Sequence, residues 1–151
     1  MNRLFLILAV VTTVQIGIPR SAFAQIGPIY FYANLSADEE SAPTESNGSG
    51  RAEFTLDRDT MRLSWVVTYV GLGQVLSAQI AGPQRVGVNG SQIYDLGKTG
   101  LKSPVKGSIV MTDGELQYLM ERHLYVNITT ARYKDGELRG QIERLPPKPS
   151  N

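Results

Sequence analysis

The sequence contains no cysteine and a single histidine, and its charged residues almost cancel. The missing cysteines exclude disulfide bonds, thiolate metal sites and cysteine nucleophiles. One histidine is too few for a metal site built from several imidazoles, so we expect no metal and no cofactor. With 15 Lys and Arg against 14 Asp and Glu, the formal net charge is +1. A balance this close to zero lacks the basic excess typical of nucleic-acid binding, and we expect no such partner.

Long apolar runs are also scarce, and the one that is present lies at the N-terminus. Arg3 precedes an apolar stretch over Leu4–Val14, and Ala22–Ala24 forms an Ala-x-Ala cleavage signature. A membrane anchor is the alternative, but a span needs about 20 apolar residues, and polar residues from Gln15 onward break the run first. We therefore predict a signal peptide over residues 1–24, export to the periplasm or the extracellular space, and no membrane span after cleavage.

Beyond this segment, apolar and polar residues alternate with the period of two that is typical of β-strands. The alternating segments are short, and residues that favour turns separate them. This pattern predicts one all-β domain over residues 25–145, an antiparallel sandwich or barrel of about eight short strands. The proline-rich end, residues 146–151, is expected to be a disordered tail. We expect the strands at 29–35, 51–57, 61–70, 76–81, 91–96, 106–111, 124–130 and 137–144.

The expected strand over 61–70 carries the single tryptophan of the chain. Trp65 is in phase with Leu63 and Val67, so we expect it in the core rather than in a position where it stacks on a ligand. Val66 and Val70 make the end of this strand apolar on both faces. That pattern indicates a central strand with cover on each side.

One helix is expected among the strands. Thr112 and Glu115 have the capping-box spacing, and apolar residues then recur at helical intervals. The helix is therefore predicted over residues 113–122. His123 falls at its C-terminal end, where donation to free carbonyls is a common structural role, and we favour this role over catalysis.

Three sequence blocks give the chain a resemblance to the CHRD domain, a module found in many secreted or exported bacterial proteins. The first block, Leu35–Pro43, shares Leu, Ser, Glu and Pro with the family's opening run. The second, Ser77–Pro83 with a later Asn-Gly pair, is similar to the family's Ala-His-Ile-His-Gly-Pro block. The third, Tyr125–Thr130 followed by Gly136–Ile142, resembles the closing Tyr-Val-Asn-Val-His-Thr and Gly-Glu-Ile-Arg-Gly-Gln-Ile signature.

The resemblance implies a β-domain that binds a partner or serves a structural role, without catalysis. Where the family pattern has histidines, this chain has Gln79, Ala81 and Thr129, so no histidine-based function carries over. We expect the second and third blocks to lie on adjacent strands, with Gln79 near Thr129. The motif positions that remain as a candidate binding surface are Glu40, Gln79, Asn127, Thr129, Glu137 and Arg139.

The closing strand can also be interpreted from its residues alone. Alternation places Gly140 on one face with apolar neighbours and Arg139 on the other face, where it can pair with a neighbouring carboxylate. A glycine in mid-strand indicates that a bulky side chain or another backbone approaches closely. Trp65 and Tyr125 are the candidates for that close approach.

Familiar catalytic motifs are missing from the sequence. No serine lies in a Gly-x-Ser-x-Gly elbow that His123 would serve as a base, and no glycine-rich loop has the spacing for phosphate binding. We therefore predict an exported, non-catalytic CHRD-like binding or structural domain, with an unknown protein or polysaccharide as its partner. The alternative is a carboxylate-based hydrolase or a calcium-dependent module acting on envelope polysaccharide. The calcium version would use the acidic run Asp38–Glu40.

Overall fold

The computed structural model describes residues 27–146, apart from residues 43 and 86–87. The predicted signal peptide lies wholly outside the described residues, as does the predicted tail beyond Pro146. Within the described ranges, no helix is long and apolar enough to cross a membrane.

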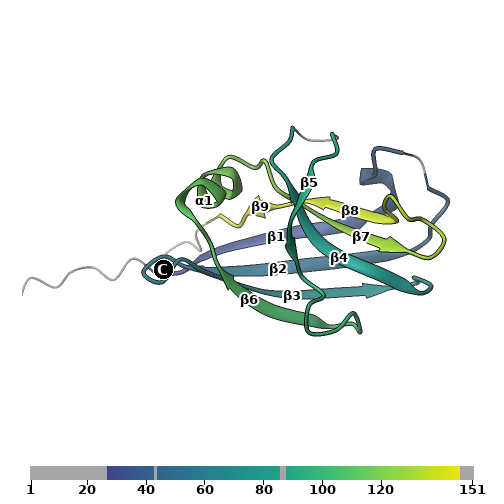
Figure 1. Cartoon of the computed structure of the whole chain (residues 1–151), viewed down its shortest axis with the longest axis horizontal. Helices are drawn as coiled ribbons and strands as arrows, with labels where there is room; N and C mark the ends of the chain where they lie inside the picture. Colours follow the sequence, from purple (N-terminus) through teal and green to yellow (C-terminus); the bar gives the residue numbers. More distant parts are fainter. Residues whose placement is uncertain (1–26, 43, 86–87, 147–151) are drawn as a thin grey trace, which may run out of the picture.

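The described part of the chain forms one antiparallel sheet with a short helix beside it (Figure 1). The strands are ordered β5-β4-β7-β8-β1-β2-β3-β6, and β9 pairs with β1. The sheet curves into half a barrel, with β5 and β6 at its two edges, so the predicted all-β antiparallel fold is confirmed in its barrel-like form. The elements are β1 Ile29–Ser36, the 3-10 helix η1 Ala37–Glu39, β2 Ser49–Asp57, β3 Arg62–Val70, β4 Val75–Gly82, β5 Ser91–Asp95, β6 Val105–Val110, α1 Asp113–Met120, β7 Tyr125–Thr130, β8 Leu138–Gln141 and β9 Glu143–Arg144.

The period-two alternation of the sequence places one face of each strand in a shared core. In β1 the buried residues are Ile29, Phe31, Ala33 and Leu35, and the residues between them along the strand are more exposed. Trp65 of β3 is buried as predicted, and its indole ring packs on Gly107 of β6, where any side chain would collide with it. The core lies on the inner side of the curved sheet.

The outer face of β3 is not covered in the way the sequence indicated. Val66 and Val70 are both exposed, so the prediction of cover on each side is wrong. Strand β3 is flanked in the plane of the sheet by β2 and β6. Valine favours the extended backbone whether or not its side chain is buried, which explains why this pattern misled.

Helix α1 begins with the predicted capping box, in which Thr112 and Glu115 bond each other's backbone N–H groups. It ends at Met120, two residues earlier than expected. The N–H groups of Arg122 and His123 donate to the carbonyls of Leu119 and Tyr118, which is the Schellman pattern of helix termination. His123 thus donates to a free helix carbonyl as expected, through its backbone N–H, and its side-chain Nδ1 lies 3.5 Å from a Glu121 oxygen.

The closing strand is interrupted at Ile142, whose N–H donates to the carbonyl of Leu124 instead of to a strand neighbour. The close approach expected at Gly140 is confirmed, but neither Trp65 nor Tyr125 causes it. The carbonyl oxygen of Asn34 occupies the place where a Cβ would stand. Strand β8 can lie this close to β1 because residue 140 has no side chain.

Candidate functional site

The second and third motif blocks lie on neighbouring strands, as predicted. Gln79 of β4 is directly opposite Asn127 of β7, and Asn127 is opposite Arg139 of β8. These three residues therefore form one row across the outer face of the sheet. Thr129 is opposite Ser77, and their hydroxyl oxygens are 2.8 Å apart. Thr129 lies two positions from Asn127 along β7, so it is a diagonal neighbour of Gln79.

Arg139 is the centre of a polar cluster on this face, although its side chain is only 2% exposed. Its Cζ lies 3.6 Å from the ring centroid of Tyr125. Nη1 donates to Asn89 Oδ1 at 2.7 Å, and Nη2 donates to the carbonyl of Val88 at 2.8 Å. The Tyr125 hydroxyl accepts from the N–H of Gly90 at 2.8 Å. The guanidinium and the phenol together fasten the end of the β4–β5 loop to the sheet.

Glu40 approaches the same cluster from the other side. Its carboxylate rests on Gly136, whose φ of 153° and lack of a side chain make room for it. Oε1 is buried and has no hydrogen-bond partner among the described residues. Burial raises the pKa of the Glu40 carboxyl to about 7, and the positive charge of Arg139 opposes this rise only in part. The expected partner of Arg139 is thus nearby, but within the described ranges Arg139 forms no ion pair.

Asn127 and Glu137 are buried as well. Asn127 is 6% exposed, and its Nδ2 donates to the carbonyl of Asp135 at 3.1 Å. Glu137, 5% exposed, accepts from Ser46 Oγ at 2.6 Å and from Thr130 Oγ1. It ties the loop before β2 to the turn between β7 and β8, away from the row that contains Arg139.

The candidate surface from the motif blocks is therefore divided in the structure. Arg139, Asn127 and Glu137 hold loops in place beneath the surface, and a ligand cannot touch them while those loops stay where they are. Glu40 is partly buried beside them. Gln79 and Thr129 are half-buried on the outer face. The three sequence blocks meet around Arg139, and the contacts they make are internal.

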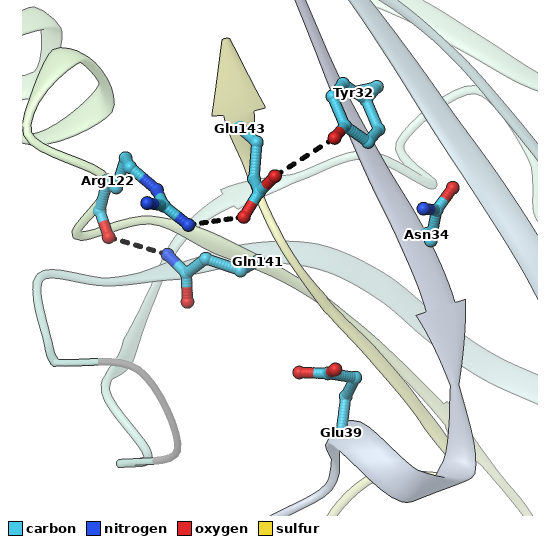
Figure 2. Close-up of a pocket in the computed structure, with 6 residues that line it drawn as sticks. All are labelled: Tyr32, Asn34, Glu39, Arg122, Gln141 and Glu143. Carbon is cyan, nitrogen blue, oxygen red and sulfur yellow. Dashed lines mark hydrogen bonds and ion pairs between the residues drawn. The ribbon is translucent and has the colours of Figure 1, made fainter.

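An open pocket with a volume of about 250 Å³ lies beside this cluster (Figure 2). We call it the Arg122 pocket. Strands β1, β8 and β9, the helix η1 and the residue after the C-cap of α1 contribute its lining. The six lining residues are Tyr32, Asn34, Glu39, Arg122, Gln141 and Glu143.

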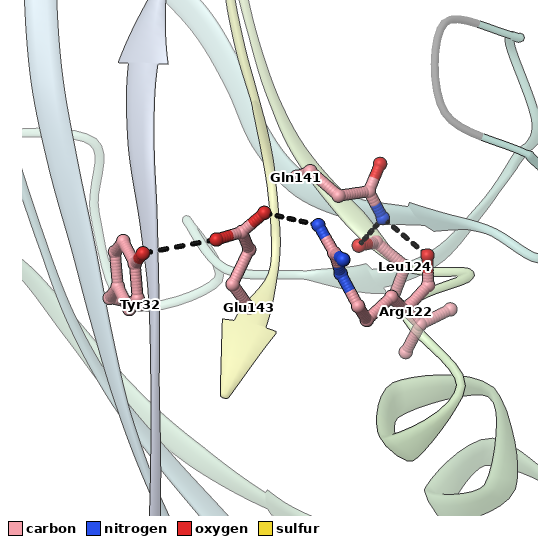
Figure 3. A network of polar contacts seen from close by, with 5 residues as sticks. All are labelled: Tyr32, Arg122, Leu124, Gln141 and Glu143. Carbon is pink, nitrogen blue, oxygen red and sulfur yellow. Dashed lines mark hydrogen bonds and ion pairs between the residues drawn. The ribbon is translucent and has the colours of Figure 1, made fainter. Parts of the chain in front are cut away.

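A continuous chain of polar contacts runs along one wall of the pocket (Figure 3). The Tyr32 hydroxyl donates to Glu143 Oε2 at 3.0 Å, and the guanidinium of Arg122 pairs with the other oxygen of the same carboxylate. This carboxylate raises the pKa of Tyr32, chiefly through the hydrogen bond. Gln141 Nε2 donates to the carbonyls of Arg122 and Leu124, both at 2.7 Å. The Gln141 amide is therefore fixed, and its Oε1 points away from those carbonyls.

Arg122 has an unusual backbone. Its φ of 62° lies in the left-handed region, at the position after a helix C-cap where glycine is the common residue. The residue preceding it, Glu121, accepts a bond from Gln117 Nε2, so the helix end is ordered by side chains too. Arg122 therefore contributes a side chain to the pocket at a position where the backbone conformation favours glycine.

Sequence reasoning placed Glu39 and Gln141 within motif blocks and missed the four other lining residues, Tyr32, Asn34, Arg122 and Glu143. They come from segments far apart in the chain, and no spacing connects them. The available signal was the stretch between α1 and the next strand, where Arg122 stands and a glycine would be expected.

No group of three or more His, Asp or Glu side chains among the described residues is placed to hold a metal ion. The acidic run that carried the calcium alternative is dispersed. Asp38 is exposed, Glu39 lines the Arg122 pocket, and Glu40 lies against Gly136. Three consecutive acids therefore have three separate environments.

Comparison with known proteins agrees with the arrangement of the blocks. The model of the CHRD domain family matches residues 31–142. Chordin from Danio rerio is 32% identical over 114 residues, a stretch that covers 74% of this chain and 12% of chordin. No solved structure matches the chain significantly. The matched region begins in β1, ends just before β9 and includes every residue of the Arg139 cluster, so the chain belongs to the CHRD domain family.

Proposed function

We propose that this protein is an exported, non-catalytic binding domain and that its ligand binds in the Arg122 pocket. The observation that carries the proposal is the left-handed backbone of Arg122. Strained residues that persist in a fold cluster at functional sites. The side chain retained at this position lines the pocket and is held in place by Glu143.

Stability alone does not account for an arginine at this position. A residue with a side chain in the left-handed region costs about 1–2 kcal/mol. An exposed ion pair returns about 0–1 kcal/mol, and Arg122 and Glu143 are 58% and 37% exposed. The pair offsets at most the lower end of this strain, and of the two non-glycine residues with positive φ in the described ranges, Met61 and Arg122, only Arg122 lines the pocket. Contact with a ligand supplies a reason for an arginine at this position.

Binding is favoured over the carboxylate-based hydrolase. Two carboxylates, Glu39 and Glu143, do line the same pocket. Hydrolysis by a carboxylate pair needs one acid in an apolar environment that keeps it protonated. Glu143 instead has a phenol and a guanidinium on its two oxygens, and Glu39 is exposed. This arrangement orients polar groups and supports recognition.

Export rests on the sequence of residues 1–24. The charged start, the apolar stretch and the Ala-x-Ala signature are those of a cleaved signal peptide. N-terminal sequencing of the protein from fractionated cells tests this part directly. A mature chain that starts at Gln25 in the periplasm or the medium supports export, and a full-length chain in the cytoplasm contradicts it.

The binding proposal is tested with the protein purified after expression of the full chain. Fluorescently labelled protein is titrated onto extracellular or envelope material from the producing cell, and saturable binding is expected. The Asn34→Ala/Glu39→Ala variant should bind more weakly, whereas Asp38→Ala, a change in the same helix outside the pocket, should bind normally. Equal binding by all three proteins, or release of product from the material by the wild type, contradicts the proposal.

A further inference from the structure

We infer that the Arg122 pocket recognises one ring of an uncharged saccharide. This inference rests on the proposed function and names the ligand class of the same site. It is drawn from the hydrogen-bonding groups that the pocket offers, from its charge and from its size.

The pocket presents both acceptors and donors to a ligand. Because Gln141 Nε2 is committed to two carbonyls, Gln141 Oε1 is left as an acceptor, and Figure 2 shows it directed toward the side of the pocket where Glu39 lies. Asn34 Oδ1 accepts from Arg51 Nη1 at 2.8 Å, which leaves the Asn34 amide nitrogen as a donor. Neither group has another partner among the described residues. A hydroxyl both donates and accepts, so adjacent hydroxyls of a sugar ring match this mixture.

The charges around the pocket disfavour an anionic ligand. Arg122 is paired with Glu143, and Arg51, which lies over the Tyr32 ring, is paired with Glu53. Glu39 remains as a carboxylate with no partner among the described residues. An anionic sugar or a phosphate would meet this charge, and no arginine is left uncompensated to attract it.

A cationic ligand is disfavoured as well. Glu39 is exposed to water, where a single carboxylate attracts a cation only weakly. Glu143 compensates the guanidinium of Arg122 in the same lining, so the pocket offers a cation no second unpaired carboxylate. An uncharged ligand with hydroxyl groups bonds Glu39 and Arg122 at once, without either conflict.

The size of the pocket sets how much of the ligand it holds. Its volume of about 250 Å³ is below the range of about 300–1,000 Å³ typical of sites for drug-sized molecules. One sugar ring fits, and because the pocket is open to solvent, the rest of a polysaccharide chain can continue outside. Arg51 covers the Tyr32 ring, so the ligand gains hydrogen bonds rather than a stacking platform. We expect a Kd on the order of 1 mM for a single short oligosaccharide.

Calorimetric titration with three kinds of trisaccharide tests the inference. The probes are uncharged trisaccharides of glucose, galactose and mannose, the trisaccharide of galacturonate, and the fully deacetylated trisaccharide of glucosamine. At least one uncharged probe should bind most tightly. Glu39→Ala should weaken that binding about tenfold, because a hydrogen bond to a charged group is lost. Asp38→Ala, the control in the same helix, should leave it within about twofold.

Two results overturn the inference. Tighter binding of the galacturonate or glucosamine probe, again weakened by Glu39→Ala, shows that the pocket binds a charged ligand; the proposed function then stands. If no uncharged probe binds at a concentration 20 times the expected Kd, the inference of a saccharide ligand is also overturned. The proposed function itself fails if the Asn34→Ala/Glu39→Ala variant binds native extracellular or envelope material as the wild type does, or if the wild type releases product from that material, so the two failures are distinguishable.

Discussion

The guanidinium of Arg139 lies over the ring of Tyr125, with Cζ 3.6 Å from the ring centroid, and both side chains are buried on the outer face of the sheet. The cation is held by an aromatic face, an amide oxygen and a carbonyl, with Glu40 close by. These partners come from all three motif blocks and their adjoining loops. The residues that carry the most specific part of the family resemblance therefore hold loops against the sheet.

Replacing Arg139 should strongly destabilise the fold. Arg139→Ala leaves the carbonyl of Val88 and the Asn89 side chain without their donor and opens a void over Tyr125. We expect the free energy of unfolding to fall by about 3–4 kcal/mol, as for other broken buried polar networks. Urea unfolding measures the change. Arg144→Ala, an exposed arginine on β9, is the control and should stay within about 0.5 kcal/mol of the wild type. If Arg139→Ala lowers the free energy of unfolding no more than Arg144→Ala does, the conclusion that Arg139 holds the loops in place is contradicted.

Glu40 should make stability depend on pH. Its pKa is about 7 in the folded protein against an ordinary value of 4.5, so the folded state holds a proton that the unfolded state has released between these values. The free energy of unfolding should therefore fall as the pH rises from 4.5 to 7 and level off above. Because the group is partly exposed, solvent screening limits the effect to about 1–2 kcal/mol.

The matched variant for this prediction is Glu40→Gln, which keeps the shape and stays neutral. The difference in stability between variant and wild type should grow through the same pH window. Parallel curves for the two proteins would show that another group is responsible. Chemical denaturation at a series of pH values provides the comparison.

The strain at Arg122 can be measured with two substitutions at one position. Both Arg122→Gly and Arg122→Ala remove the ion pair with Glu143, but only glycine adopts the left-handed backbone without cost. We expect the glycine variant to be more stable than the alanine variant by about 1 kcal/mol. Thermal and urea unfolding of the two proteins give this difference. Alanine equal to or better than glycine would mean that the position is unstrained and that the argument for a functional Arg122 is unsupported.

Gly140 should not tolerate a side chain. A Cβ at this position would overlap the carbonyl of Asn34, so Gly140→Ala must push β8 away from β1. We expect a loss of about 3 kcal/mol or more. Gly114 in the first turn of α1 has open space around its Cα, and Gly114→Ala should be neutral or stabilising by up to about 1 kcal/mol. Equal effects at both glycines would contradict the close packing of the two strands.

The fold was predictable because period-two alternation and turn residues repeat along most of the chain. The hairpin of β2 and β3, the capping box at Thr112 and the burial of Trp65 all follow from local patterns. The order of strands in the sheet does not, since Gly140 packs against a strand about a hundred residues earlier in the sequence. Local patterns misled at Val66 and Val70, because apolar residues on both faces of a strand do not show whether a second layer covers the sheet.

The site was less accessible to sequence reasoning. The family pattern indicated Arg139, Asn127 and Glu137, but their burial depends on loops that fold back over the sheet. The Arg122 pocket joins side chains from β1, η1, β8, β9 and the end of α1, and only the structure brings them together. The left-handed backbone of Arg122 has no sequence signature other than the absence of a glycine after the end of the helix.

We propose that the motif residues hold the loops in place and that the Arg122 pocket beside them binds the ligand. Two-dimensional ¹⁵N–¹H NMR tests this claim most directly, because asparagine and glutamine side-chain amides report from both places. During titration with the tightest uncharged trisaccharide, the amides of Asn34 and Gln141 should shift saturably, while those of Asn89 and Asn127 should stay in place. Shifts centred on Asn89 and Asn127, with Asn34 and Gln141 unchanged, would contradict the claim.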